Sequence, residues 1–300
     1  MYVVTGATGH TGSIIAQTLL AKGEKVRVVG RTRERLEPFT RKGAEPAVAD
    51  LTDATALTRA FSGAGSVYAM IPPNPGSPDV RAYQAAVTKA IVKALEAARV
   101  SRAVVLSSVG ADKPEKTGPV VGLYELEGQI RALAGVQALF IRAGYFMENL
   151  LPQTGVIKNF GVMAGPVRGD LLLPMIATQD IAEYAAEKML RPDFEGKQAR
   201  ELLGQRDITY NEVVRVIGAA IGRPQIGYMQ MPDEQLKPAL MQMGMSDNMA
   251  GLLLEMAGAL NSGYMAAREK RSPQNTTSTA IERFASETFV PAFEGRSAHA

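Results

Sequence analysis

Cysteine and tryptophan are absent from this sequence of 300 residues, and histidine occurs only twice, at His10 and His299. Without cysteine, the chain can form no disulfide, has no thiol nucleophile and cannot bind zinc through thiolates. With only two histidines, a histidine-rich metal site is excluded as well. We therefore expect a protein whose function does not depend on a metal ion.

A long apolar run and a strong excess of either charge are also missing. No apolar stretch reaches the roughly 18 to 20 residues that a membrane-spanning helix needs, and no basic segment precedes the first apolar residues. The formal charge is +3, and basic and aromatic residues do not interleave as they do in single-strand-binding proteins. We expect a cytoplasmic protein that acts on a small-molecule substrate and binds neither membrane nor nucleic acid.

The most informative stretch is the glycine-rich beginning of the sequence. A β-branched run over residues 2–5 is followed by Gly6, Gly9 and Gly12, and then by an apolar helical segment over residues 13–21. This pattern predicts a strand, a tight turn and a helix N-terminus. Unpaired N–H groups at a helix start bind anions, and glycines let a pyrophosphate come close. We interpret the stretch as a dinucleotide-binding turn.

A second strand, predicted over residues 25–30, completes a β-α-β unit of the size expected for a parallel crossover. Arg31 follows directly, where dinucleotide-binding folds usually carry an acidic residue for the ribose 2′-hydroxyl. An arginine at this place suits a 2′-phosphate, so we expect NADP(H), with NAD(H) less favoured. Arg33 or Arg35 would be a second cation. The alternative is that the three arginines only begin a solvated helix.

Strands and helices then alternate six times, which indicates an α/β protein with a doubly wound parallel sheet. The remaining strands are predicted over residues 43–50, 66–71, 102–108 and 137–142. Asp50 stands at the carboxyl end of the first of these four strands. In such sheets ligands lie outside the carboxyl ends, so Asp50 could meet the adenine amino group. It could equally cap the helix that follows.

The rhythm changes beyond residue 149. A hairpin-like piece, short strands and helices are predicted over residues 161–174, 179–190, 199–203, 210–221, 226–231, 233–264 and 281–289. We therefore expect an NAD(P)-binding domain over residues 1–150 and a separate, mostly helical α+β region over residues 151–300, which the family resemblance described below implies to be substrate-binding. The last helix, about residues 279–290, is a candidate to pack back on the first domain. The Met-rich helix suits an adaptable apolar pocket and is compatible with a homodimer.

Four motifs, in this order, are similar to motifs of the NmrA-like family in the atypical short-chain dehydrogenase/reductase superfamily. They are Thr5-Gly-Ala-Thr-Gly-His-Thr-Gly12, Val104-Val-Leu-Ser-Ser-Val-Gly110, Arg142-Ala-Gly-Tyr-Phe-Met-Glu-Asn149 and Thr178-Gln-Asp-Ile-Ala182. The resemblance covers nearly the whole chain. One departure is Ala143, where the family usually has proline after the arginine.

The resemblance implies a Rossmann-type cofactor domain with a smaller substrate domain, and it implies roles for individual residues. The pyrophosphate would contact Thr8, Gly9, His10 and Thr11, and the 2′-phosphate would contact Arg31. Asp50 and Leu51 would flank the adenine, and Met70, Ile71, Pro72 and Pro73 would line the adenosine and ribose side. Ser107, Ser108, Gly144, Tyr145 and Phe146 would border the nicotinamide, with Asn149 closing the motif.

The acid–base pair of a typical short-chain dehydrogenase is missing. Such enzymes use Tyr-x-x-x-Lys on a helix, with a serine that polarises the carbonyl. Ser107 or Ser108 could be that serine, but Tyr124 on the following helix is followed four residues later by Gly128. The single Tyr-x-x-x-Lys, Tyr184 to Lys188, falls in a helix that we expect on the substrate-domain side, and we interpret it as accidental.

Two functions remain open. The first is an NADPH-dependent reductase that passes hydride to a conjugated acceptor such as a quinone or an azo or triarylmethane dye. Its candidate catalytic residues are Tyr124, Ser107 and Tyr145, and Glu125 could assist. The second is a non-catalytic sensor that binds NADP(H) and reports to a protein partner. We favour the reductase.

Overall fold

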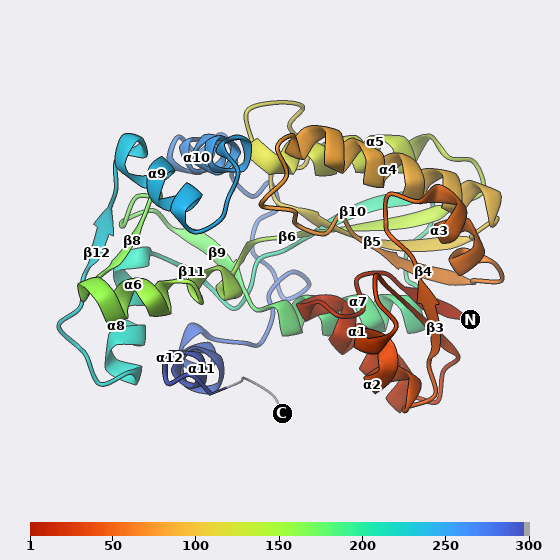
Figure 1. Cartoon of the computed structure of the whole chain (residues 1–300), viewed down its shortest axis with the longest axis horizontal. Coiled ribbons are helices and arrows are strands. Elements are labelled where there is room, and N and C mark those ends of the chain that lie inside the picture. Colours follow the sequence, from red (N-terminus) through yellow and green to blue (C-terminus); the bar gives the residue numbers. More distant parts are fainter. Residues whose placement is uncertain (297–300) are drawn as a thin grey trace.

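The computed structural model describes residues 1–296, and a parallel sheet of seven strands lies at its centre (Figure 1). The strand order is β10-β6-β5-β4-β1-β2-β3, and every neighbouring pair is parallel. The strands are β1 (Tyr2–Val4), β2 (Val26–Gly30), β3 (Glu45–Val48), β4 (Ser66–Ala69), β5 (Arg102–Ser108), β6 (Gln137–Ala143) and β10 (Lys197–Leu202). Apart from β10 this is the Rossmann order, so the predicted fold class is confirmed.

Helices cover both faces of the sheet and make three layers (Figure 1). One face carries α3 (Ala54–Phe61), α4 (Val80–Ala97) and α5 (Val121–Ala132), and the other carries α1 (His10–Ala21), α2 (Glu37–Thr40) and α7 (Thr178–Leu190). The central strands are nearly continuous apolar runs because helices bury them on both faces. Asp53 begins α3, and its carboxylate accepts the N–H groups of Thr55 and Ala56.

Two elements from beyond residue 150 lie in these layers. Strand β10 adds to the sheet beside β6, and α7 packs against α1. Ala182 and Ala185 of α7 share a buried cluster with Ile15 and Leu19 of α1, since small side chains let the two helices approach closely. The expectation that the helix containing Tyr184 lies on the substrate-domain side was therefore wrong.

The second part of the molecule is built from short strands and from helices. Its elements are β7 (Tyr145–Phe146), α6 (Gln153–Phe160), β8 (Met163–Gly165), β9 (Leu173–Ile176), β11 (Asp207–Ile208), α8 (Tyr210–Ala220), β12 (Tyr228–Gln230), α9 (Asp233–Gln242), α10 (Asp247–Asn261), α11 (Ile281–Phe284) and α12 (Val290–Phe293). A π-helical turn, Ala285–Phe289, joins α11 to α12, and 3-10 turns span Glu34–Leu36, Gly118–Val120 and Met147–Leu150.

Two predictions for this part were wrong. Residues 161–174 do not form a hairpin, because β8 pairs with β12 whereas β9 pairs with β11 and β7. The long helix expected over residues 233–264 is broken between α9 and α10, where Gly244 has a positive φ of 93°. Ser246 then begins α10 by accepting the N–H of Met249.

The last helical segment packs on α8 of the second part, so the expectation that it packs back on the first domain was wrong. Ile281, Phe284 and Phe289 belong to the same buried cluster as Val213 and Ile217 of α8. Just before this segment, the N–H and hydroxyl of Thr279 donate to the carboxylate of Asp180 on α7, at 3.0 and 2.6 Å. Residues 297–300, at the end of the expected substrate region, lie outside the described residues.

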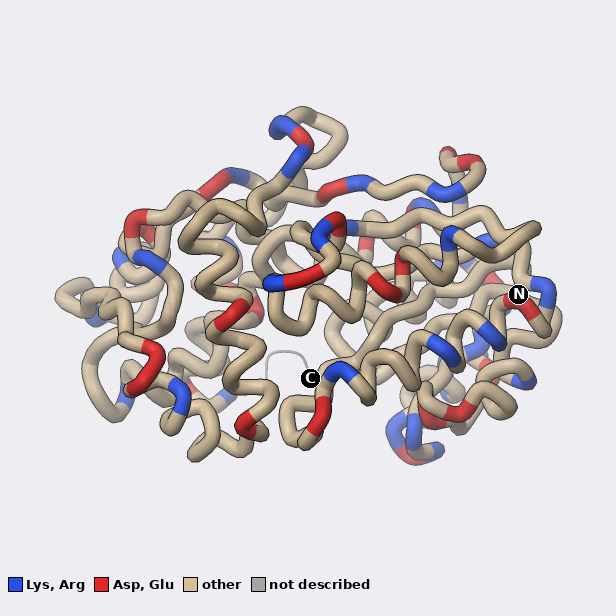
Figure 2. Tube along the Cα trace, turned by 90° about the horizontal axis from the view of Figure 1, so that it is seen from above, with Lys and Arg blue, Asp and Glu red and all other residues tan. Residues whose placement is uncertain are grey.

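Charged residues of both signs are spread over both parts of the chain (Figure 2). Many of them pair locally, as in the ion pairs of Arg206 with Glu212 and Glu282, at 2.9 and 2.7 Å. Within residues 1–296, no helix combines the length and the apolar character that crossing a membrane requires.

Candidate functional site

The three glycines of the first turn are each needed for a different reason. Gly6 has a φ of +61°, which favours glycine. At Gly12 a Cβ would lie 2.3 Å from the carbonyl oxygen of Gly6, so glycine lets the helix start approach the strand end. Gly9 has an ordinary φ of −97°, and a Cβ there would approach only the Gly6 oxygen, at 3.3 Å. The space beside Gly9 is therefore open to a ligand.

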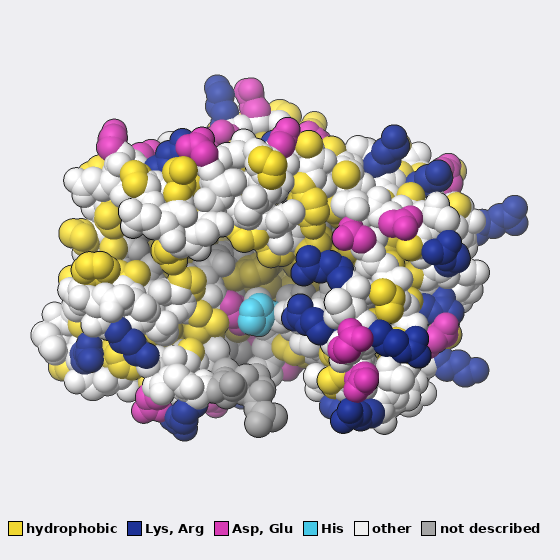
Figure 3. Space-filling model, viewed as in Figure 1, with side chains coloured by type: hydrophobic (Ala, Val, Ile, Leu, Met, Phe, Trp, Pro, Cys, Tyr) yellow, Lys and Arg dark blue, Asp and Glu magenta, His cyan; other side chains and the backbone are white. Residues whose placement is uncertain are grey.

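The N-terminus of α1 faces this open space. In the part of the chain that the structure describes, no side chain caps the start of α1, where Gly9 is the first flanking residue. The hydroxyl of Thr11 is paired with the phenol of Tyr68, at 2.8 Å. An anion at the helix start would therefore meet Thr11 through the backbone N–H of that residue. His10 is exposed. Figure 3 shows a hollow between the two parts of the molecule, with histidine and basic side chains at its rim.

Arg31, Asp50 and Tyr83 come together beyond this turn. Hydrogen bonds from the Thr52 hydroxyl and N–H, at 2.6 and 2.8 Å, lower the pKa of Asp50, and the nearby charge of Arg31 acts in the same direction. Both bonds use Oδ1, so Oδ2 has no partner among residues 1–296. Arg31 is exposed and forms no hydrogen bond or ion pair within the same residues. Asp53, not Asp50, caps α3.

A cavity of about 720 Å³ opens at the carboxyl ends of β4, β5 and β6. The wall on the sheet side is lined by residues that the sequence predicted, namely Met70, Ile71, Pro72, Pro73, Ser107, Ser108, Gly144, Tyr145, Phe146 and Asn149. The opposite wall comes from residues 171–174, from Met249 and Met256 of α10, and from much of residues 263–271. The lining is mostly apolar and includes the charged residues Asp207, Glu269, Lys270 and Arg271.

Ser107 is buried and its hydroxyl is committed. Its Oγ donates to Oε1 of Glu127 at 2.7 Å. The carboxylate of Glu127 is held in turn by two hydrogen bonds from Arg142, at 2.9 and 2.7 Å, which raise the pKa of that arginine. In this arrangement Ser107 offers the cavity an acceptor, whereas polarising a carbonyl group requires a donor. Ser108 likewise donates to the Val109 carbonyl, at 2.9 Å.

Tyr145 lies on β7, just after a glycine that the packing requires. A Cβ on Gly144 would lie 2.3 Å from the carbonyl oxygen of Pro174, so only glycine lets β9 come this close. The hydroxyl of Tyr145 accepts a hydrogen bond from the Tyr210 hydroxyl, at 3.0 Å. Burial raises the pKa of Tyr145, and the polar groups of Tyr210 and Asn149 oppose this shift. Tyr145 therefore brings a protonated phenol to the cavity wall.

Some predicted residues lie elsewhere. Tyr124 is 40% exposed and is not part of the cavity wall, because α5 turns Leu123 and Glu127 inward and residue 124 away. Leu51 is buried in the core beside α3.

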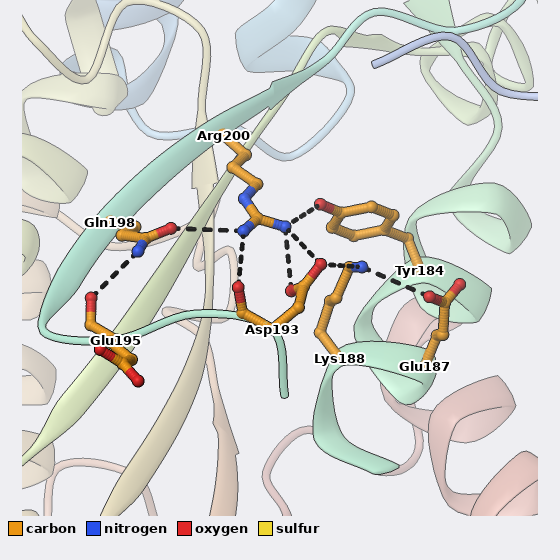
Figure 4. Close-up of polar contacts among 7 residues, drawn as sticks. All are labelled: Tyr184, Glu187, Lys188, Asp193, Glu195, Gln198 and Arg200. Carbon is orange, nitrogen blue, oxygen red and sulfur yellow. Dashed lines mark hydrogen bonds and ion pairs between the residues drawn. The ribbon is translucent and has the colours of Figure 1, made fainter. Parts of the chain in front are cut away.

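The Tyr-x-x-x-Lys of α7 also lies outside the cavity wall. Figure 4 shows its side chains directed at Asp193 and Arg200. Lys188 pairs with Asp193 at 2.8 Å, and the Tyr184 hydroxyl accepts from Arg200 at 3.3 Å. These contacts join α7 to β10, which agrees with the interpretation of the motif as accidental.

The segment over residues 263–271 was not foreseen as part of the site. The buried carboxylate of Glu201, near the end of β10, accepts the N–H groups of Arg268 and Glu269, at 2.9 and 2.8 Å. Arg271 donates to the carbonyl oxygens of Leu203 and Gly204, at 2.9 and 2.6 Å. No signal in the sequence indicated that residues 263–271 line the cavity, because Glu201, Leu203 and Gly204, which hold this segment, lie more than sixty residues away in the sequence.

The family model described as "NmrA-like family" matches residues 2–282. The chain belongs to the NmrA-like family. The resemblance inferred from the four motifs is therefore confirmed. The first three motifs lie at the carboxyl ends of β1, β5 and β6, and the fourth, Thr178–Ala182, forms the start of α7.

Known proteins similar to this NmrA-like chain include enzymes. An NAD(P)H azoreductase of Xenophilus azovorans is 28% identical over 268 residues, which cover 89% of each chain. Among solved structures, an NADPH-dependent quinone oxidoreductase from Escherichia coli in complex with NADPH has a TM-score of 0.82 at 23% identity, and 96% of this chain and 100% of that chain are covered. The Citrobacter sp. triphenylmethane reductase complexed with NADP(H) has a TM-score of 0.80 at 19% identity, with 96% and 100% covered. These structures share the fold of this chain.

Proposed function

We propose that this protein is an NADPH-dependent reductase that transfers hydride to a small conjugated acceptor, such as a quinone or an azo or triarylmethane dye. The observation that carries the proposal is the apolar cavity of about 720 Å³ at the carboxyl ends of β4 to β6. A flat conjugated acceptor fits an apolar cavity of this size. The names of the relatives, which are reductases of such acceptors, support the same chemistry.

The residues fit an NADP(H) cofactor. The uncapped start of α1 and the open space beside Gly9 suit its pyrophosphate. Arg31 suits the 2′-phosphate, and the free oxygen of Asp50 suits the adenine amino group. Tyr83, which lines the cavity and lies near the charges of Arg31 and Asp50, links the two ends of the site. The nicotinamide would then lie at the wall formed by Ser107 and residues 143–146.

When bound, the cofactor supplies the hydride. The chain itself contributes position and a water-poor surface, because side chains such as Met249, Met256 and Phe146 surround the acceptor. Ser107, with its proton directed at Glu127, can accept a hydrogen bond from the cofactor or the acceptor. The phenol of Tyr145 is the protonated group that we assign to the acceptor side.

The test is NADPH oxidation by purified protein in the presence of quinones, azo dyes and triarylmethane dyes. We expect turnover with at least one class of acceptor, measured as the loss of nicotinamide absorbance. Turnover should be slower with NADH than with NADPH. Tight NADPH binding without turnover of any acceptor would contradict the reductase and would favour a protein that binds NADP(H) and signals to a partner. Pull-down experiments with and without NADPH would then identify that partner.

A further inference from the structure

Acceptors of hydride differ in whether they need a proton. An azo or quinone acceptor that receives a hydride becomes an anion and needs one proton to give the hydrazine or hydroquinone. A cationic triarylmethane dye that receives a hydride becomes the neutral leuco dye and needs no proton. A cavity that serves neutral acceptors well should therefore contain a proton donor, whereas one that serves only cationic dyes needs none.

The hydroxyl groups at the cavity wall are not equivalent as donors. The Ser107 hydroxyl donates a hydrogen bond to the Glu127 carboxylate, at 2.7 Å, and the Ser108 hydroxyl donates one to the Val109 carbonyl oxygen, at 2.9 Å. The oxygen of Tyr145 instead accepts a hydrogen bond from the Tyr210 hydroxyl. Asn149, which also lines the cavity, is the second hydrogen-bonding neighbour of this hydroxyl. Because the Tyr145 oxygen accepts from Tyr210, its own proton is not used in that contact and can point into the cavity.

Tyr210 is held firmly in the position from which it donates. It is the first residue of α8, and Thr209 caps this helix by accepting the N–H of Glu212 at 3.1 Å. Tyr210 is 6% exposed, and its ring meets the Tyr145 ring edge-on at 6.2 Å and stacks on the Tyr228 ring at 4.6 Å, both measured between ring centroids. Tyr228 is fixed in turn by donation to the Val167 carbonyl at 2.6 Å. The position of the Tyr210 oxygen is therefore set by packing, and its hydrogen bond to Tyr145 sets the direction of the O–H group.

We propose that Tyr210 is a positioning residue that makes Tyr145 a directed proton donor, so that the cavity delivers a proton to acceptors that become anions on receiving hydride. The proposal rests on the reductase function proposed above. The O–H bond of Tyr145 breaks as the new N–H or O–H bond of the product forms. The Tyr210 hydroxyl stabilises the phenolate that remains, and water returns the proton to Tyr145 after the product leaves. The electron pair comes with the hydride from NADPH, so each turnover consumes one NADPH and one proton.

The experiment compares the two kinds of acceptor in matched variants. The variants are Tyr145→Phe and Tyr210→Phe, and Tyr228→Phe is the control because its hydroxyl contacts Val167 and its ring stacking is kept. The probes are crystal violet as the cationic acceptor, and menadione and 4-(dimethylamino)azobenzene as neutral acceptors. The measurements are kcat and KM for each acceptor, KM for NADPH, and the solvent isotope effect in D₂O.

We expect kcat for neutral acceptors to fall about 10²-fold or more in Tyr145→Phe, as for loss of a general acid. In Tyr210→Phe it should fall roughly 10-fold, as for loss of a hydrogen bond to a developing charge. Crystal violet turnover should change less than about 3-fold in both, and Tyr228→Phe should keep the wild-type ratio of the two rates. Wild type should be slower in D₂O with neutral acceptors only, and the Tyr145→Phe variant should lose this difference.

Equal losses with both kinds of acceptor would mean that the tyrosines only support the structure, and unchanged rates would mean that the proton comes from elsewhere. Either result overturns the proposal, and so does a wild type that reduces crystal violet but no neutral acceptor. A wild type that reduces none of the acceptors contradicts the reductase function itself. That outcome is separate, because it is seen before any variant is compared.

Discussion

Arg31 is the residue on which cofactor preference should depend. It follows β2 directly, is exposed, and forms no hydrogen bond or ion pair within residues 1–296, while its charge reaches Asp50. A free guanidinium at this place matches the geometry of a phosphate.

In Arg31→Glu, we expect the Kd for NADPH to rise roughly 10- to 100-fold, because a charge-assisted contact becomes a repulsion. The Kd for NADH should change less than about 3-fold. Arg59→Glu, on the exposed side of α3, makes the same change of net charge away from the site and should leave both values unaltered. Fluorescence titration of each nucleotide provides the measurement. Equal losses for NADPH and NADH would show that Arg31 is only a surface residue.

Single residues of the site could be predicted where the neighbouring residues in one motif are enough to indicate their role. The glycine turn and Arg31 are of this kind, because a few adjacent residues define them. Hydrogen-bond partners could not be predicted, because Ser107 and Glu127 lie 20 positions apart and Tyr145 and Tyr210 lie 65 apart. These partners decide whether a hydroxyl is a donor or an acceptor, so the sequence could name candidate groups and leave their chemistry open.

At the scale of elements, α10 forms much of one cavity wall and is docked on a single glycine. Gly118 has a φ of +57°, and a Cβ there would lie 2.0 Å from the carbonyl oxygen of Leu252 in α10. The N–H of Gly118 also donates to Glu255, at 3.2 Å. The position of α10, and with it that of Met249 and Met256, depends on this close approach.

Gly118→Ala should push α10 outward and lower the free energy of unfolding by about 1–2 kcal/mol for the left-handed backbone alone. We expect the KM for the acceptor to rise several-fold, with little change in NADPH affinity. Gly128→Ala is the matched control, since this exposed helical position has open space for a Cβ and should gain up to about 1 kcal/mol. Urea denaturation and steady-state kinetics test both variants. A normal KM for the acceptor in Gly118→Ala would show that α10 does not shape the cavity.

Long elements were predicted well and short ones poorly. Helix α8 and strands β5 and β6 contain several periods of their apolar pattern, so their positions followed from the sequence. Strands β7 and β11 have two residues each and were missed. Their hydrogen-bond partners are distant in the sequence. For the same reason the hairpin predicted over residues 161–174 was wrong, since β8 and β9 belong to two different sheets.

At the scale of the whole molecule, the two halves of the chain are interleaved. Strand β10 completes the edge of the sheet, α7 covers α1, and Thr279 and Glu201 tie later segments to these elements. The sequence predicted a change near residue 149 because the alternation of strands and helices stops there. The sequence did not indicate that α7 and β10 come back to the central sheet, because elements of the second part precede them in the chain.

We therefore expect the chain to unfold in one cooperative transition in spite of its two parts. NADPH at about 100 times its Kd should stabilise the whole transition by about 2.7 kcal/mol, because ligand binding to the folded state is linked to its stability. Differential scanning calorimetry with and without NADPH measures this. Two separate unfolding transitions, of which NADPH shifts only one, would show that the two interleaved parts do not unfold as one cooperative unit.

The interleaving has a consequence for biosynthesis. The first six strands of the sheet leave the ribosome well before residues 178–202, which supply α7 and β10. Until then, one side of α1 and the outer edge of β6 lack their partners, and an open strand edge invites pairing with other chains. Completion of the seven-stranded sheet must therefore wait for about two thirds of the chain, which makes the nascent protein a candidate client of ribosome-associated chaperones.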